Sequence, residues 1–180
     1  MFPDPAEIPP PPTRKSLRLQ RHDYSHPGPY FVTISTHDQQ GTLSTIQAGV
    51  IILTAIGEIA RAAWNSRFQG LVLDACVIMP NHLHAILLLA PSIPAIKAKE
   101  RTYSLPDIIG AFKSISTNQA NLILKRRDQP IWHRSYHDHI IRNSRELRNI
   151  QLYICENPIR WQNRINALHG KPQCHRANPS

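Results

Sequence analysis

The chain has 180 residues, of which 41% are apolar, 21 are lysine or arginine and 12 are acidic, and its formal net charge is +9. This length suits one compact domain with a tail or two, and the apolar fraction excludes a chain that is disordered throughout. A small basic domain often binds a polyanion, so nucleic acid is a candidate partner, although the charge alone is equally consistent with a basic protein that binds none.

The cysteines and the N-terminus narrow the class of protein further. Cys76, Cys155 and Cys174 are far apart, odd in number and include no CxxC pair, which favours reduced thiols over a zinc knuckle or a disulfide framework. The N-terminus has no secretory pattern, and no stretch approaches the roughly 18 apolar residues of a membrane helix. We therefore expect a cytoplasmic protein.

The two ends of the chain differ in composition from the middle. Residues 1–17 start with a proline-rich segment, which predicts an extended or disordered arm, and residues 166–180 form a polar tail. We predict a single domain over residues 18–165. Its first basic residues, Arg18 and Arg21, form either a solvated arm or one that touches phosphate.

The first half of the domain shows strand and helix patterns in turn. Residues 30–36 are rich in β-branched and aromatic side chains and predict a strand, with a turn at Gly41 and a short extension at 45–47. Apolar residues at helical spacing predict a helix over 53–68, which Gly70 ends. Residues 71–79 and 82–90 then predict an apolar hairpin in the centre of a sheet.

A second helix is predicted after Ser104. Ser104 has the character of an N-cap and Asp107 occupies the capping-box position. An apolar face that includes Phe112 and Leu122 extends this helix to about residues 125–127.

The last elements complete the predicted topology. Residues 131–142 predict a fourth strand, and Asn143 can cap a final helix with an apolar inner stripe. Pro158 is expected to kink or end that helix near residue 157. The order strand, helix, strand, strand, helix, strand, helix predicts an α+β, ferredoxin-like antiparallel sheet with helices on one face and an added C-terminal helix.

Two histidines lie two residues apart in the second hairpin strand. His82 and His84 would point from one face of the sheet, with Leu83 toward the core, and two imidazoles at this spacing can hold one cation. Two incidental histidines at a sheet edge are the alternative. A nucleotide hydrolase of the histidine-triad type would need a third histidine at position 86, where the chain has Ile86.

A tyrosine and an asparagine share one face of the final helix. Tyr153 and Asn157 are four residues apart, beside the apolar stripe. A phenol can attack phosphorus when a metal polarises the phosphate, and an amide oxygen can be a third ligand. Packing of Tyr153 at a helix boundary is the alternative, and Tyr136 is the rival nucleophile.

Three stretches together resemble a known family: residues 30–34, residues 79–84 with the paired histidines, and residues 136–161. Over residues 18–161 the chain resembles the single-tyrosine transposases of the HUH class, especially the branch of REP-associated tyrosine transposases. The resemblance implies a ferredoxin-like fold and a Mg²⁺ or Mn²⁺ ion. It matches His82 and His84 to the histidine ligands, Tyr153 to the nucleophile that forms a 5′-phosphotyrosine link, and Asn157 to a third ligand.

The family's usual substrate is single-stranded DNA with a short hairpin. Phosphate contact is then expected from basic residues that are equally consistent with a solvated helix face or arm, namely Lys113, Lys125, Arg126, Arg127, Arg18 and Arg21. Zinc also suits two imidazoles and an amide oxygen. The resemblance leaves a homodimer and a monomer both open.

The sequence thus predicts a transposase-like endonuclease and strand transferase. Two alternatives remain at this point. One is a non-catalytic domain of the same fold that binds single-stranded nucleic acid, and the other is a metal-dependent hydrolase that uses water in place of tyrosine.

Overall fold

A computed structural model describes residues 23–38, 41–64, 71–90 and 103–169 of the chain. Most of the predicted arm and tail, with Arg18, Arg21 and Cys174, lies outside the described residues, and residues 166–169 still belong to the last helix. The elements in chain order are β1 (Gly28–Ser35), β2 (Ser44–Gln47), β3 (Val50–Leu53), α1 (Ala55–Trp64), β4 (Leu71–Ile78), β5 (His82–Leu89), α2 (Leu105–Ile123), β6 (His137–Ile140) and α3 (Ser144–His169).

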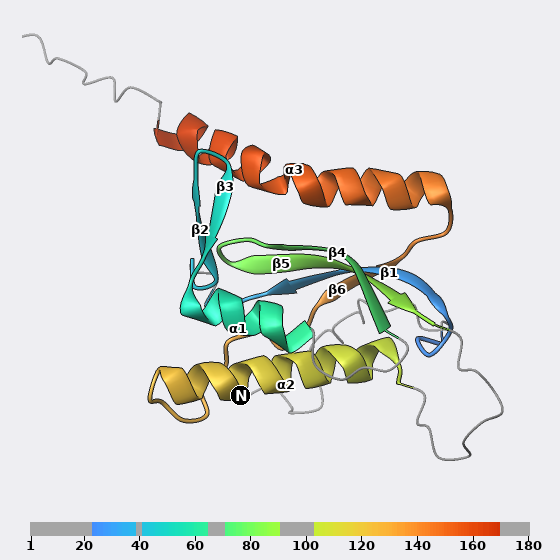
Figure 1. Ribbon diagram of the computed structural model, residues 1–180, viewed down its shortest axis with the longest axis horizontal. Coiled ribbons are helices and arrows are strands. Elements are labelled where there is room, and N and C mark those ends of the chain that lie inside the picture. The colour runs from blue at the N-terminus through green and yellow to red at the C-terminus, as the bar shows by residue number, and fades with distance from the viewer. Residues whose placement is uncertain (1–22, 39–40, 65–70, 91–102, 170–180) are drawn as a thin grey trace, which may run out of the picture.

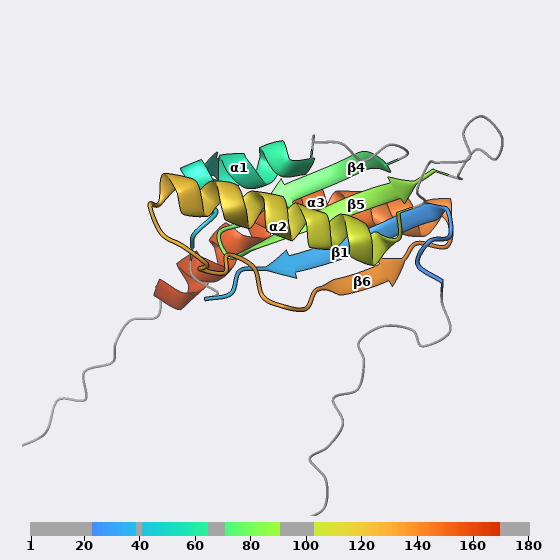
Figure 2. The ribbon, with the colours of Figure 1, turned by 90° about the horizontal axis from the view of Figure 1, so that it is seen from below.

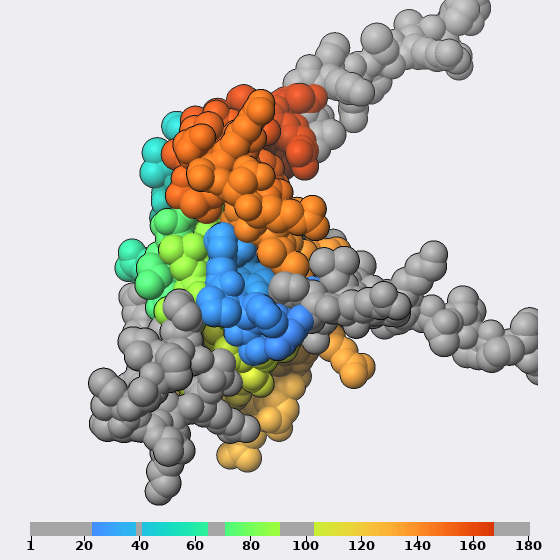
Figure 3. Space-filling model, turned by 90° about the vertical axis from the view of Figure 1, so that its right-hand side faces the viewer, coloured from blue at the N-terminus to red at the C-terminus, as the bar shows by residue number. Residues whose placement is uncertain are grey.

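Four of the described strands form an antiparallel sheet of order β4-β5-β1-β6 with a helical layer on each face, and β2 and β3 form a separate two-stranded sheet. Figures 1 and 2 show α1 and α2 side by side on one face and α3 on the other. In the end-on view of Figure 3, α3 in orange lies above the blue start of β1, and α2 lies below it. This arrangement confirms the predicted α+β ferredoxin-like fold with an added C-terminal helix.

The main core lies between the sheet and the α1–α2 layer. Alternate residues of the two central strands point into it and are almost fully buried, namely Tyr30, Val32, Ile34, Leu83, Ala85 and Leu87. From the helices, the rings of Trp64 and Phe112 stack with their centroids 4.0 Å apart. The prediction that Leu83 points into the core is therefore confirmed.

The predicted capping of α2 is confirmed, but its outer face is corrected. The Ser104 hydroxyl accepts from the backbone N–H of Asp107, and the Asp107 carboxylate accepts from that of Ser104. Leu122, which we expected on the buried face, is 78% exposed. The buried stripe centres nearer Ile109 and Ser116, and at about 100° per residue Leu122 lies about 120–140° around the helix from them.

The β2–β3 hairpin was not predicted. Ala48 and Gly49 have φ values of 50° and 77°, so they form the two-residue turn that joins tightly paired strands. The predicted start of the first helix at residue 53 was consequently wrong, because Leu53 pairs in the hairpin and α1 begins at Ala55. The Thr54 hydroxyl caps α1 by accepting from the Gly57 N–H at 3.1 Å.

Two further boundaries differ from the prediction. Of residues 131–142 only His137–Ile140 form β6, while Trp132 makes an isolated bridge to Thr36. Of the two outcomes predicted at Pro158, a kink or an end, the end is wrong, because α3 continues through Pro158 to His169. A proline removes one N–H bond of the ladder, and here its side chain is buried, so packing offsets the lost bond.

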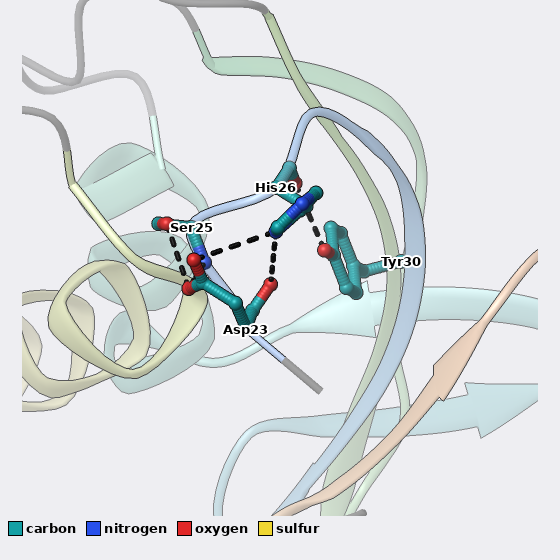
Figure 4. A network of polar contacts seen from close by, with 4 residues as sticks. All are labelled: Asp23, Ser25, His26 and Tyr30. Atoms are coloured by element: carbon teal, nitrogen blue, oxygen red, sulfur yellow. Dashed lines mark hydrogen bonds and ion pairs between the residues drawn. The ribbon is translucent and has the colours of Figure 1, made fainter. Parts of the chain in front are cut away.

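Local polar networks fix where the chain enters β1 and α3. In Figure 4, Ser25 donates to Asp23 Oδ1 from its N–H at 2.9 Å and its hydroxyl at 2.7 Å. Tyr30 donates to the His26 carbonyl at 2.9 Å. At α3 the Glu146 N–H donates to Asn143 Oδ1 at 2.9 Å, which confirms Asn143 as its N-cap.

Two predictions about the wider class of protein can be compared with the described residues. None of their helices combines the length and apolar character needed to cross a membrane. Cys76 and Cys155 form no disulfide bond in this part of the chain.

Candidate active site

Two histidines meet on the sheet face that α3 covers. His82 and His84 alternate with the core residues of β5, and their Nε2 atoms lie 3.2 Å apart. Across the sheet their register partners on β1 are Ser35 and Thr33. The predicted common face for the two imidazoles is therefore observed.

Each imidazole is held at its Nδ1 atom by a neighbouring side chain. His82 Nδ1 lies 2.7 Å from Asn81 Oδ1, and His84 Nδ1 lies 2.8 Å from Thr33 Oγ1. An amide oxygen only accepts, so the proton on neutral His82 is on Nδ1 and its Nε2 carries a lone pair. The Phe31 ring stacks on His84 at 5.3 Å between centroids. The two rings are thus fixed with Nε2 toward each other.

The surroundings keep both imidazoles neutral. Burial and, to a smaller extent, the nearby His82 together lower the pKa of His84 to about 3. Burial also lowers the pKa of His82 below its usual value of 6.5. A neutral imidazole with a free Nε2 lone pair is the form that binds metal ions.

This donor pair has the spacing of two ligands to one cation. For imidazole nitrogens about 2.1 Å from a metal, octahedral or tetrahedral angles separate the nitrogens by about 3.0–3.4 Å. The observed Nε2–Nε2 distance of 3.2 Å lies in that range. Within the described residues no group of three or more His, Cys, Asp or Glu side chains could hold a metal. Among the described residues, a further protein ligand would therefore be a group such as an amide oxygen, beside oxygens of water or phosphate.

The α3 tyrosine reaches the histidine pair. The Tyr153 hydroxyl lies 3.4 Å from His84 Nε2, and its ring contacts Phe31 edge-on at 6.1 Å between centroids. Tyr153 is 38% exposed, so its side chain is partly open to solvent. Asn157, one turn further along α3, is buried at 8% exposure. Tyr136, the rival nucleophile, belongs to the core cluster of the α1–α2 side instead.

Contacts at both flanks of α3 set its position over the sheet. Gln151 donates to the Asp74 carboxylate of β4 at 2.8 Å, on the flank away from Tyr153. At the start of the helix the Glu146 carboxylate accepts from the Arg142 N–H at 2.7 Å and lies 2.6 Å from His139 Nε2 on β6. These two hydrogen bonds lower the pKa of Glu146. The helix is therefore tied to both edges of the sheet.

The basic residues predicted to contact DNA lie apart from this site where the structure describes them. Lys113 Nζ, on α2, donates to the backbone carbonyls of His133, Arg134 and Ser135 at 2.9, 3.3 and 3.0 Å. Lys125, Arg126 and Arg127 follow the end of α2 and are exposed. α2 packs on the sheet face opposite α3, so none of these cations lies in the histidine layer.

Sequence reasoning missed the residues that orient the imidazoles. Thr33 and Phe31 were recognised only as parts of a strand, because their roles depend on the β1–β5 register that places them beside His84. Asn81 lies between the two predicted hairpin strands and was given no role in the site. Trp161, whose ring centroid lies 5.9 Å from that of His82, was also not assigned to the site. The one local signal in the sequence for a residue that orients an imidazole was the amide of Asn81, which directly precedes His82.

Comparisons with known proteins agree with the architecture. No protein-family model matches the chain. The chain is similar to an uncharacterised protein of Haemophilus influenzae, with 28% identity over 164 residues that cover 83% of this chain and 90% of that protein. It is also similar to the solved structure of a REP-associated tyrosine transposase bound to a REP hairpin, with 21% identity and a TM-score of 0.57, over 80% of this chain and 74% of the other. The chain shares the fold of that transposase.

Proposed function

We propose that this protein is a metal-dependent transposase-like enzyme that cuts single-stranded DNA and transfers the strand through a phosphotyrosine. The observation that carries the proposal is the 3.4 Å approach of the Tyr153 hydroxyl to His84 Nε2, beside a second imidazole 3.2 Å from the first. The fold shared with a REP-associated tyrosine transposase supports the same reading.

The proposed site consists of four side chains of this chain. His82 and His84 would provide two nitrogen ligands, and Asn157, buried one helical turn after Tyr153, would provide an oxygen ligand from α3. A bound Mg²⁺ or Mn²⁺ would polarise a non-bridging oxygen of the scissile phosphate. Both imidazoles are neutral and have buried surroundings, which suits this role. Zinc fits the same nitrogen donors, so the identity of the ion is decided by experiment.

Tyr153 is the proposed nucleophile. Its phenol oxygen forms a bond to phosphorus while the bond from phosphorus to the 3′-oxygen breaks, which leaves a 5′-phosphotyrosine and a 3′-hydroxyl. The phenol loses its proton and the leaving oxygen gains one, so the step balances. Because Nε2 of His84 is assigned to the cation, the phenol proton passes to another group or to water. A later hydroxyl can reverse the step without ATP, because the phosphodiester energy is kept.

The part of the sheet that α3 leaves uncovered supports one proposed direction of approach for DNA. α3 packs on β4 and β5, whereas Tyr153 lies on the other flank of the helix, toward Phe31 of β1. On β6, His137 pairs with Thr33, so it shares the histidine face, and it is exposed. We therefore propose that the scissile strand enters over β1 and β6. Lys113, Lys125, Arg126 and Arg127, with Arg18 and Arg21, remain proposed contacts to DNA away from the scissile phosphate.

A denaturing gel with end-labelled hairpin DNA tests the function. With Mn²⁺ present, we expect a labelled band at the mass of protein plus DNA, and none with EDTA. Free cleaved DNA without the adduct would instead mean hydrolysis by water, and unchanged DNA would mean binding alone.

The Tyr153→Phe variant tests the nucleophile. The lost hydroxyl should abolish the adduct, whereas DNA affinity should change little because the ring remains. Tyr103→Phe, which alters an exposed tyrosine before α2, is the matched control and should form the adduct normally. An adduct on Tyr153→Phe would refute the assignment.

A further inference from the structure

The Thr33 side chain holds the second imidazole, and the role inferred for it here rests on the proposed function. The hydrogen bond between His84 Nδ1 and Thr33 Oγ1 is 2.8 Å long. A hydroxyl can donate or accept, whereas the Asn81 amide oxygen that holds His82 only accepts. The two imidazoles are therefore held by partners of different kinds.

The distances fix a consistent set of protons for the protein without a cation. Asn81 Oδ1 accepts from His82 Nδ1, so His82 Nε2 is an acceptor. Two lone pairs 3.2 Å apart would repel each other without a cation, so His84 Nε2 carries the hydrogen of that contact. The Tyr153 hydroxyl, 3.4 Å from the same nitrogen, is then an acceptor. Neutral His84 consequently has no hydrogen on Nδ1, and the Thr33 hydroxyl donates to this atom. The polar chain runs from Thr33 through both imidazoles to Asn81.

A cation between the imidazoles needs a different arrangement. Both Nε2 atoms must then present lone pairs, so His84 gives up its Nε2 proton and takes one at Nδ1. The Thr33 hydroxyl must turn from donor to acceptor at the same atom. The charge of His84 does not change, and no hydrogen bond is lost at Nδ1.

We propose that Thr33 is a positioning residue whose reversible hydroxyl lets His84 change tautomer between a hydrogen-bonded imidazole pair and a metal-ligand pair. A side chain at position 33 that can only donate would keep His84 protonated at Nε2, the form that cannot bind a cation. An apolar side chain there would leave the buried Nδ1 of His84 without a hydrogen-bond partner. Outer-shell partners of this kind change metal affinity by about 10–100-fold.

The experiment measures Mn²⁺ affinity by electron paramagnetic resonance on the full chain. Thr33→Val, which keeps the shape and removes the hydroxyl, should bind Mn²⁺ about 10–100-fold more weakly than the wild type. Thr33→Ser, which keeps the hydroxyl, should bind Mn²⁺ as tightly as the wild type. Ser35→Ala is the matched control, because Ser35 lies two residues along the same strand face, opposite His82, and should leave the affinity unchanged.

A spectroscopic measurement separates positioning from general damage. Long-range ¹H–¹⁵N spectra of the wild type should show His84 protonated at Nε2 without metal and at Nδ1 with saturating Mg²⁺. Equal Mn²⁺ affinity of Thr33→Val and the wild type, or one unchanged His84 tautomer in both states, would overturn the inference alone. If the wild type binds no Mn²⁺, the proposed function fails and the inference fails with it.

Discussion

The two faces of the sheet are built from the same strands but have different contents. Toward α1 and α2, residues 30, 32 and 34 of β1 and 83, 85 and 87 of β5 are apolar and at most 1% exposed. Toward α3, the alternate residues of the same two strands include Thr33, His82 and His84. The nearby phenol of Tyr153 is partly open to solvent. A smaller apolar cluster that includes Met79 and Ile86 packs beside the polar residues.

Along each central strand, residues that stabilise the fold therefore alternate with residues of the candidate site. Because side chains alternate across a strand, a β5 residue such as Leu83 packs into the main core while its neighbours on both sides form the site. Desolvated imidazoles cost free energy, and the fully apolar face opposite offsets that cost. The first prediction below changes only the α3 face of the sheet, and the second changes only the α1–α2 face.

The largest expected effect follows from removing both imidazoles. We expect the His82→Ala, His84→Ala double variant to lose Mn²⁺ binding and to form the DNA adduct about 10²–10⁴-fold more slowly, since metal stabilisation of transition-state charge is worth several kcal/mol. Mn²⁺ titration and adduct yield over time measure the two effects.

A surface imidazole provides the control for this variant. His26 lies in the loop before β1 and its side chain is 67% exposed, so His26→Ala should retain Mn²⁺ binding and adduct formation. Full adduct formation by the double variant would show that chemistry does not depend on the histidine face.

The next effect concerns the opposite face. Phe112 packs between Trp64 and Trp132, with centroid distances of 4.0 and 5.2 Å, and is fully buried. Phe112→Ala should lower the free energy of unfolding by about 3–5 kcal/mol, measured in urea. The Mn²⁺ affinity of the protein that remains folded should not change. A large loss of affinity at full folding would mean that the two faces are coupled.

The sequence predicted most of the sheet and both segments of the candidate site, because each has a local pattern. A run of β-branched and aromatic residues identified β1, two apolar runs identified β4 and β5, and the capping residues located α2 and α3. The pair His82 and His84 and the pair Tyr153 and Asn157 were recognised from spacings of two and four residues, which strand and helix geometry convert into shared faces.

What the sequence did not predict depends on contacts between distant segments or on unusual backbone. The β2–β3 turn has Ala48 at φ 50°, where glycine or asparagine would have been the signal. α3 passes through Pro158 because tertiary packing outweighs a local breaker. Thr33 gained its role only when the strand register placed it opposite His84.

The third prediction uses pH to sharpen the contrast between the faces. His84 has a pKa of about 3 in the folded protein and 6.5 as its usual value, so the unfolded chain binds its proton first as pH falls. Metal-free protein should therefore lose about 2 kcal/mol of stability from this residue between pH 6.5 and pH 5, at 1.36 kcal/mol per unit. Urea unfolding in EDTA measures the loss.

Two comparisons isolate the contribution of His84. Carboxylates such as Glu146, whose pKa is lowered from 4.5, titrate below this window. The His84→Gln variant should show a flatter profile from pH 6.5 to 5. The same slope in the variant and the wild type would assign the pH dependence to other groups.

The smallest expected effect tests whether DNA also contacts the α2 side. Lys125 and Arg127 are exposed beyond the end of α2, on the layer opposite Tyr153. If they bind phosphates, the double variant Lys125→Gln, Arg127→Gln should bind hairpin DNA more weakly, and the slope of log affinity against log salt should fall by about one per residue. The cleavage rate at saturating DNA should stay constant, because neither side chain lies near the phenol.

Arg61→Gln on α1, where Arg61 pairs with Glu58, controls for the loss of charge alone. An unchanged salt slope in the double variant would make these cations a solvated helix end and confine DNA binding to the rest of the molecule.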